Sequence, residues 1–259
     1  GNVWKIRGVD CLCSAQIGLC SYPGHAANTD ELLKRLDLAV SAASDCGPNQ
    51  MAVYDSSMHT QFVRRQAVAM YLQTALEKNE LEVRYRPTYN LKEGRFTRAD
   101  SYMRIFIQGI GLVGAAEFMP IAEDSGQIRA IGYYALDHAG KCISELMKTG
   151  RDFDSICIPV SPVLLVQEDF LDQVTQVLET YQIPKGKLAL EVDDSALSNV
   201  YLNVNITMQE LSDMGVELVL NNFGSGCAPV SSILDLPINT VKLERMFVWQ
   251  LETNPKSAS

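Results

Sequence analysis

Polar side chains follow several short apolar segments of this sequence, and their types could do metal chemistry. Carboxylates, amides and one lysine stand at or just after such segments: Asp100, Glu191, Asp193, Asp194, Asn221, Asn222, Lys242 and Glu244. If the segments are parallel strands, their carboxyl ends are where α/β folds gather working residues. Carboxylates there would suit a hard divalent cation such as magnesium. Spacing alone favours a structural alternative, in which Asp193 and Asp194 cap a helix near Ser195 and the two asparagines shape a loop.

The elements that must position these residues alternate between strand and helix from about residue 80 onward. Short apolar segments predict strands over 81–85, 96–103, 155–160, 188–192, 217–220 and 240–243. Amphipathic spacing predicts helices over 117–148 in one or two pieces, over 168–181 and over 206–214. This alternation favours a parallel sheet covered by helices, in either a barrel or a doubly wound sheet. Periodicity does not choose between those two.

The first part of the chain is organised differently. Alternating apolar and small residues predict a strand over 9–22 that ends in a Pro-Gly turn. A helix is expected over 29–46, followed by a short strand over 51–54. A long helix over 56–79 is then expected to join two units.

Composition narrows the class of protein. The 259 residues include 31 acidic and 22 basic side chains, a formal net charge of -9, and 47% hydrophobic residues. Such an apolar chain can bury enough surface to fold, which excludes disorder. The acidic balance argues against binding along a nucleic acid polymer. No apolar run reaches the roughly 18 residues of a membrane segment, and the first residues do not form a signal peptide, so a cytoplasmic protein is expected.

The seven cysteines are scattered along the chain and odd in number: Cys11, Cys13, Cys20, Cys46, Cys142, Cys157 and Cys227. Their spacing matches neither a disulfide framework nor a zinc site. Packed free thiols are therefore expected, because reduced cysteine is usually buried.

Six segments of the second part occur in the order seen in EAL domains. They cover residues 85–87, 99–104, 117–123, 190–197, 221–226 and 241–248. On these motifs the region 80–259 resembles an EAL domain, a family of modified (β/α)8 TIM-like barrels. The resemblance implies hydrolysis of the bacterial second messenger cyclic di-GMP with magnesium or manganese. Six of eight expected strands can be found, so the barrel is expected to be incomplete at its C-terminal end.

The region before it resembles the second half of a GGDEF domain, the diguanylate cyclase fold that often precedes EAL. The matching segments are 14–18, 22–23, 30–33, 37–39, 47–49 and 54–55. The cyclase signature would lie before residue 1, so this chain is not expected to be a cyclase. The expected organisation is a partial GGDEF-like α+β region over 1–55, a linking helix over 56–79 and an EAL barrel over 80–259.

Substitutions fall on most positions where the resemblance places metal ligands. The family holds two cations with carboxylates and an asparagine, and a lysine positions the attacking water. Asp100 stands for the signature glutamate, Pro159 for the asparagine, and Asn221 and Asn222 for two aspartates, while Glu191 and Lys242 are retained. Losing ligands removes both charge neutralisation and the nucleophile. No catalytic or metal site is therefore expected, with Asp100 and Glu191 as weak metal candidates. Replacement ligands from Asp193, Asp194 or Glu244 are the alternative.

Ligand binding is a separate question. Six basic residues lie in the segment 84–104: Arg84, Arg86, Lys92, Arg95, Arg98 and Arg104. The resemblance places Arg104 at a phosphate of cyclic di-GMP, a contact that suits arginine. Arg86 replaces a family glutamine and Tyr102 a family leucine, and both are candidate ligand-binding residues. The alternative is that these arginines form a solvated strand face.

These observations predict a catalytically inactive EAL-type signalling domain. It would be a cyclic di-GMP receptor or a protein-interaction module, either a homodimer through the barrel or bound to a protein partner, and no cofactor is expected. Two alternatives remain open: an active phosphodiesterase that needs magnesium or manganese, and a scaffold that binds no nucleotide.

Overall fold

The computed structural model describes residues 3–6, 9–12, 14–194, 204–224 and 236–250, with side chains from residue 14 onward. The chain divides into two compact units, 1–70 and 71–259, and each is described by itself. The division falls inside helix α2 (Ser56–Glu77), the helix expected over 56–79.

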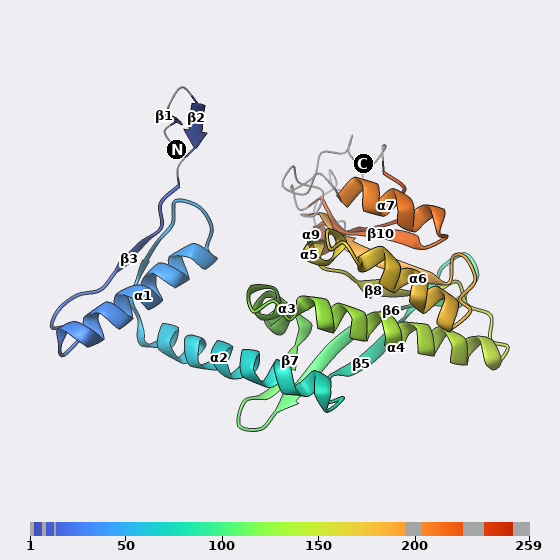
Figure 1. The fold of residues 1–259 in the computed structure, drawn as a ribbon, viewed down its shortest axis with the longest axis horizontal. Helices are drawn as coiled ribbons and strands as arrows, with labels where there is room; N and C mark the ends of the chain where they lie inside the picture. The colour runs from blue at the N-terminus through green and yellow to red at the C-terminus, as the bar shows by residue number, and fades with distance from the viewer. Residues whose placement is uncertain (1–2, 7–8, 13, 195–203, 225–235, 251–259) are drawn as a thin grey trace. The chain divides into compact units, whose positions relative to one another are not determined.

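The first unit is built from two small sheets and a helix (Figure 1). Strands β1 (Val3–Ile6) and β2 (Val9–Leu12) form an antiparallel pair, and β3 (Ile17–Leu19) and β4 (Met51–Val53) form a parallel pair. The continuous strand predicted over 9–22 is therefore wrong, because β2 and β3 belong to different sheets. Helix α1 (Thr29–Asp45) is capped at its amino end by Asn28, whose Oδ1 accepts from Glu31 N at 2.9 Å.

The second unit holds one mixed sheet and the helices that cover it. Its strands are β5 (Glu82–Asn90), β6 (Arg95–Ile107), β7 (Gly111–Gly114), β8 (Ser155–Pro159), β9 (Leu188–Asp193), β10 (Glu217–Phe223) and β11 (Thr240–Leu243). They run in the order β11-β10-β9-β8-β6-β5, with β7 also on β6. Pairing is parallel from β6 to β11, but β5 and β7 lie antiparallel to β6. The expectation of a wholly parallel sheet is corrected here, because β5 and β6 form a hairpin.

The helices of this unit pack on one face of the sheet, as Figure 1 shows for α4 and α6. They are α3 (Ala115–Asp124), α4 (Ile128–Lys148), α5 (Pro162–Leu165), α6 (Phe170–Thr180) and α7 (Val204–Asp213). A further helix, α9 (Arg245–Gln250), follows β11. Alternation along β6 explains the packing: Ser101, Met103 and Ile105 are buried on the covered face, whereas Asp100 and Tyr102 point to the other. None of the described helices is long and apolar enough to cross a membrane.

The sheet is curled, because side chains from distant strands meet on its uncovered face. Strands β6 and β11 are four pairing steps apart in the sheet order. In a flat sheet four steps would separate them by about 19 Å. Instead, Arg98 Nη1 on β6 donates to Thr240 Oγ1 on β11 at 2.9 Å, and Arg98 also lies 3.4 Å from Glu217 Oε2 on β10. These contacts hold the amino ends of the strands around a concave face.

The cysteines within the described side chains are free thiols. Cys157 is buried and Cys20 and Cys142 are half-buried, as expected of packed thiols, but Cys46 is exposed and the packing prediction is wrong there. The predictions for Cys11, Cys13 and Cys227 fall outside the described side chains.

Candidate functional site

A pocket opens on the concave face, at the carboxyl ends of the parallel strands. Its volume is about 310 Å³, and residues of five strands line it: Arg86, Asp100, Ser101, Tyr102, Glu191, Asn221 and Lys242. Strand register brings them together, because Asp100 lies opposite Cys157 and Pro159 lies opposite Glu191 in adjacent strands. The structure thus brings Asp100, Glu191, Asn221 and Lys242 together at this end of the sheet.

Lys242 lies between two carboxylates of the pocket. Its Nζ donates to Asp100 Oδ1 at 2.8 Å and also to Glu191 Oε2. The side chains of Lys242, Asp100 and Glu191 are 30%, 33% and 14% exposed. Burial opposes the charge of the lysine, but the hydrogen bond to Asp100 and the nearby acidic groups outweigh it, so the pKa of Lys242 is raised above its ordinary value. Lys242 is therefore a charged ammonium group at neutral pH.

Sequence reasoning missed Cys157 as a member of this cluster. Its thiol is buried and lies 3.8 Å from Glu191 Oε2, to which it donates. Burial raises the pKa of the Cys157 thiol, which stays protonated at neutral pH. The alternation of a strand could have found it, because Cys157 and Pro159 are two residues apart on β8 and share a face.

The structure brings together two of the three residues expected to bind a ligand. Arg86 and Tyr102 both line the pocket, and the guanidinium carbon of Arg86 lies 5.4 Å from the centre of the Tyr102 ring. This distance is that of a cation–π contact. Arg104 lies on the same face of β6 but outside the pocket lining, and its Nε donates to Glu82 Oε2 at 2.5 Å. Among the described side chains no carboxylate forms an ion pair with Arg86, which leaves its charge available to an anionic ligand.

Most other basic residues of this segment are paired with acidic ones. Arg84, Arg95, Arg98 and Arg104 each lie within ion-pair distance of at least one carboxylate. Glu82 bridges Arg84 and Arg104, and hydrogen bonds from these two residues lower the pKa of Glu82 to about 2. The alternative of a charged strand face therefore describes these four arginines, but not Arg86.

Asn221 and Asn222 diverge, although they are adjacent. Asn221 lines the pocket, whereas Asn222 has a φ of 55° and lies within an irregularity of the β10–β11 pairing, between Leu220 and Phe223. Its Nδ2 donates to Asp193 Oδ2 at 2.7 Å, away from the pocket lining. The cap expected at Ser195 and the loop after Gly224 lie outside the described residues.

The donor set of the pocket does not fit a pair of hard divalent cations. Within the described part of the chain, one group could hold a metal: Asp100, Cys157 and Glu191, whose ligand atoms lie within 4.8 Å of one another. Magnesium prefers octahedral oxygen ligands, and a thiol is a soft one. Pro159 has no side-chain oxygen, and the Lys242 ammonium already bonds both carboxylates. Asp193 bonds Asn222, and Glu244 accepts from Met246 N, so neither carboxylate lies in the pocket lining.

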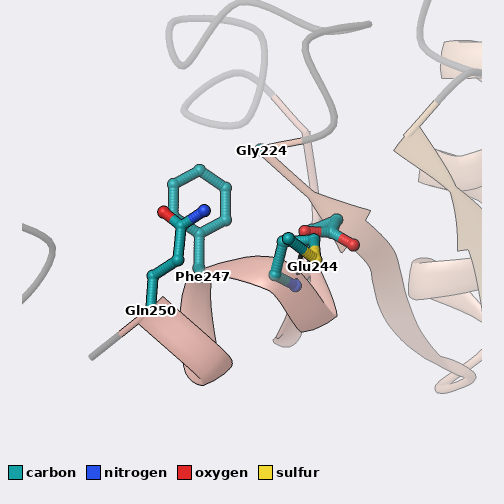
Figure 2. Close-up of a pocket in the computed structure, with 5 residues that line it drawn as sticks. Gly224, Glu244, Phe247 and Gln250 are labelled. Carbon is teal, nitrogen blue, oxygen red and sulfur yellow. Dashed lines mark hydrogen bonds between the residues drawn. The ribbon is translucent and has the colours of Figure 1, made fainter. Parts of the chain in front are cut away.

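A second cavity, of about 400 Å³, lies beside α9 (Figure 2). Gly224, Glu244, Met246, Phe247 and Gln250 line it. A Cβ at Gly224 would lie 2.3 Å from Phe247 Cε2, so the ring approaches the backbone as only glycine permits. The described lining offers one carboxylate and no cation, which makes it a poorer candidate than the first pocket.

A curled α/β sheet with its polar pocket at the carboxyl ends of parallel strands defines the class of barrel-type α/β domains. Within that class the chain belongs to the EAL domain family, whose sequence model matches residues 70–259.

Curated relatives match nearly the whole chain. The signalling protein YkoW of Bacillus subtilis is 26% identical over 254 residues, 98% of this chain and 32% of its own length. The bifunctional diguanylate cyclase/cyclic di-GMP phosphodiesterase MucR of Pseudomonas aeruginosa is 27% identical over 256 residues, 99% of this chain and 37% of its own length. The chain thus spans about a third of the length of these relatives.

Solved structures share the fold. The MucR phosphodiesterase in complex with c-di-GMP superposes with a TM-score of 0.68 at 26% identity, over 74% of this chain and 77% of that one. The FimX EAL domain from Pseudomonas aeruginosa, bound to c-di-GMP, gives a TM-score of 0.65 at 19% identity, over 73% and 76% of the two chains. The EAL-type fold expected from the sequence is confirmed.

Proposed function

We propose that this chain is an EAL-type signalling domain that binds cyclic di-GMP without hydrolysing it. A role as a protein-interaction module in the same signalling is the alternative if no nucleotide binds. The observation that carries the proposal is the chemistry of the pocket: it keeps a free arginine beside an aromatic ring, but its carboxylates are bonded to a lysine. The similar MucR phosphodiesterase was solved as a complex with c-di-GMP, which supports this nucleotide as the ligand.

Binding would use the charge and the aromatic face that the pocket offers. Arg86 is available for a phosphate, to which arginine donates two parallel hydrogen bonds. The Tyr102 ring beside it can stack on a base. Arg104 would join the phosphate contact if the ligand displaced it from Glu82.

Hydrolysis is not expected, because phosphodiester cleavage by two metals needs ligands for both. Pro159 and Asn221 supply no negative charge, and Asn222 bonds Asp193 instead. The proposal therefore treats Asp100, Glu191 and Lys242 as remnants that shape the pocket.

The test is titration calorimetry with cyclic di-GMP, with and without magnesium, together with chromatography for linear pGpG. We expect heat of binding in both titrations and no pGpG. Metal-dependent pGpG would overturn the inactive assignment, and the absence of heat would favour the interaction module.

The proposal extends to the first unit, as a remnant that resembles the second half of a GGDEF domain. The MucR match covers 99% of this chain and so includes this unit. Incubation with GTP is expected to give no cyclic di-GMP. Sedimentation of the purified chain would then distinguish a homodimer from a monomer that binds a different protein.

A further inference from the structure

The carboxylates of the pocket stand in a geometry that a cation could use. Ligand atoms of Asp100, Cys157 and Glu191 lie within 4.8 Å of one another. Two of these residues carry negative charges and are only partly exposed, at 33% and 14% of their side chains. Two partly buried like charges at this separation repel each other unless a positive charge lies between them.

The chain itself supplies that positive charge. Lys242 Nζ bonds one oxygen of Asp100 and one of Glu191, each a charge-assisted hydrogen bond. A divalent ion that used these same two oxygens would have to displace the ammonium group from them, because Lys242 already bonds both.

We infer that Lys242 is the resident cation of the pocket and excludes divalent ions from the Asp100–Glu191 site. The inference rests on the proposed function for the role of the pocket, but it concerns only which cation the carboxylates hold. Lys242 thus acts as a positioning residue that keeps both carboxylates in place without metal. The pocket therefore does not fit a two-metal centre for two reasons: several ligands are lost, and Lys242 occupies the two carboxylates that remain.

The test is a manganese titration of the nucleotide-free protein, followed by electron paramagnetic resonance of free Mn²⁺. The variants are Lys242→Met, which removes the charge at similar length, and Lys242→Arg, which keeps it. We expect no saturable Mn²⁺ binding at this pocket in the wild type or in Lys242→Arg. In Lys242→Met we expect binding stronger by at least about tenfold, lost again in Lys242→Met/Asp100→Asn.

Saturable Mn²⁺ binding by the wild type that disappears in Asp100→Asn would overturn the inference. Equal absence of binding in the wild type and in folded Lys242→Met would overturn it too, because the carboxylates would then not be a cation site. If Lys242→Met does not fold, ¹⁵N-lysine NMR of the wild type tests whether Mn²⁺ reaches Lys242. The Lys242 ammonium signal should keep its intensity on addition of Mn²⁺, and selective broadening would contradict the inference.

The proposed function and this inference can fail separately. Loss of nucleotide binding in calorimetry removes the receptor proposal and leaves the Mn²⁺ result untouched. Mn²⁺ binding without pGpG formation removes the inference and leaves the receptor proposal standing.

Discussion

Asp100 and Lys242 are 142 residues apart in the sequence, yet Lys242 Nζ lies 2.8 Å from Asp100 Oδ1. The contact joins β6 to β11, four pairing steps away in the sheet order. It exists because the sheet curls, and it places one positive charge where several strands end.

Lys242→Met is expected to destabilise the second unit by about 1–3 kcal/mol, less than for a fully buried pair because water reaches part of the site. The substitution leaves Asp100 and Glu191 without their shared partner. Urea unfolding followed by circular dichroism measures the change. Lys141→Met, at an exposed position on α4, is the matched control and should change stability little. If both substitutions changed the free energy of unfolding equally, the bonds of Lys242 to Asp100 and Glu191 would not be what stabilises the unit.

Above neutral pH, the Lys242 contribution to stability should change only in alkali. The pKa of Lys242 is raised above its model-compound value of 10.5, so the folded state holds this proton more tightly than the unfolded state. The stabilisation is fully present below the unfolded value and is lost as pH rises through the folded value. The stability difference between wild type and Lys242→Met should therefore stay constant from neutral pH to about pH 10 and shrink above it. A difference that already shrinks near pH 8 would be inconsistent with a raised pKa.

Arg86→Ala is expected to weaken cyclic di-GMP binding by about 10- to 100-fold, the range of a charged hydrogen bond. Arg86 is the pocket arginine without a carboxylate partner among the described side chains. Calorimetry with Arg95→Ala as control tests this, because Arg95 lies on the same hairpin but pairs with Glu93 and Asp152. Arg104→Ala should also weaken binding if the ligand reaches that residue. Unchanged affinity of Arg86→Ala would remove the proposed phosphate contact.

Glu82→Gln is expected to strengthen nucleotide binding several-fold, because it releases Arg104 and Arg84 from a competing carboxylate. The nucleotide phosphate and the Glu82 carboxylate are both anions that two arginines can hold. The control is Glu93→Gln, which removes one of the two carboxylates that pair with Arg95 outside the pocket. Affinity should rise in the first variant and not in the second. A fall in affinity of Glu82→Gln would mean that Glu82 positions the arginines for the ligand.

Gly224→Ala is expected to displace α9, because its Cβ would lie 2.3 Å from Phe247 Cε2 and its φ is 95°. Gly109→Ala is the control: its φ is 83°, but a Cβ there meets nothing within 4 Å. Both changes carry about 1 kcal/mol of backbone strain, and the clash adds about 1–3 kcal/mol in Gly224→Ala. Fluorescence of Trp249 on α9, in a Trp4→Phe background, reports the displacement. Equal spectra for both variants would show that the Phe247 ring moves aside without displacing α9.

The strands of the second unit could be predicted because most of them are short apolar segments between helices. The segment predicted over 217–220 begins where β10 begins, and the one over 188–192 begins with β9 and ends one residue before β9 ends. Strand direction could not be predicted in the same way, because buried and exposed side chains alternate along a strand whether it pairs antiparallel in a hairpin or parallel to its neighbour. The turn that reverses the chain after Asn90 carried the missed signal: Gly94, with a φ of 66°, donates its N–H to Asn90 O.

The candidate site was predicted only in part. Asp100, Glu191 and Lys242 could be placed near one another, because each lies in a predicted strand of the same sheet. The turn of Asn222 away from the pocket could not, because it depends on a backbone φ of 55° that the residue type does not dictate. The pairing of Arg104 with Glu82 could not be predicted either, because it depends on the register of β5 and β6.

Strand β11 ends the sheet order and has one neighbour, β10, within the described part of the sheet. Its Val241 and Leu243 side chains are exposed, while Thr240 and Lys242 make the two contacts with β6. An end strand with few buried side chains opens at lower free energy than the core of a sheet. Hydrogen exchange should therefore be faster in β11 than in β9. Since β11 carries Lys242, each such opening would release the two carboxylates of the pocket while β8, β9 and β10 stay folded.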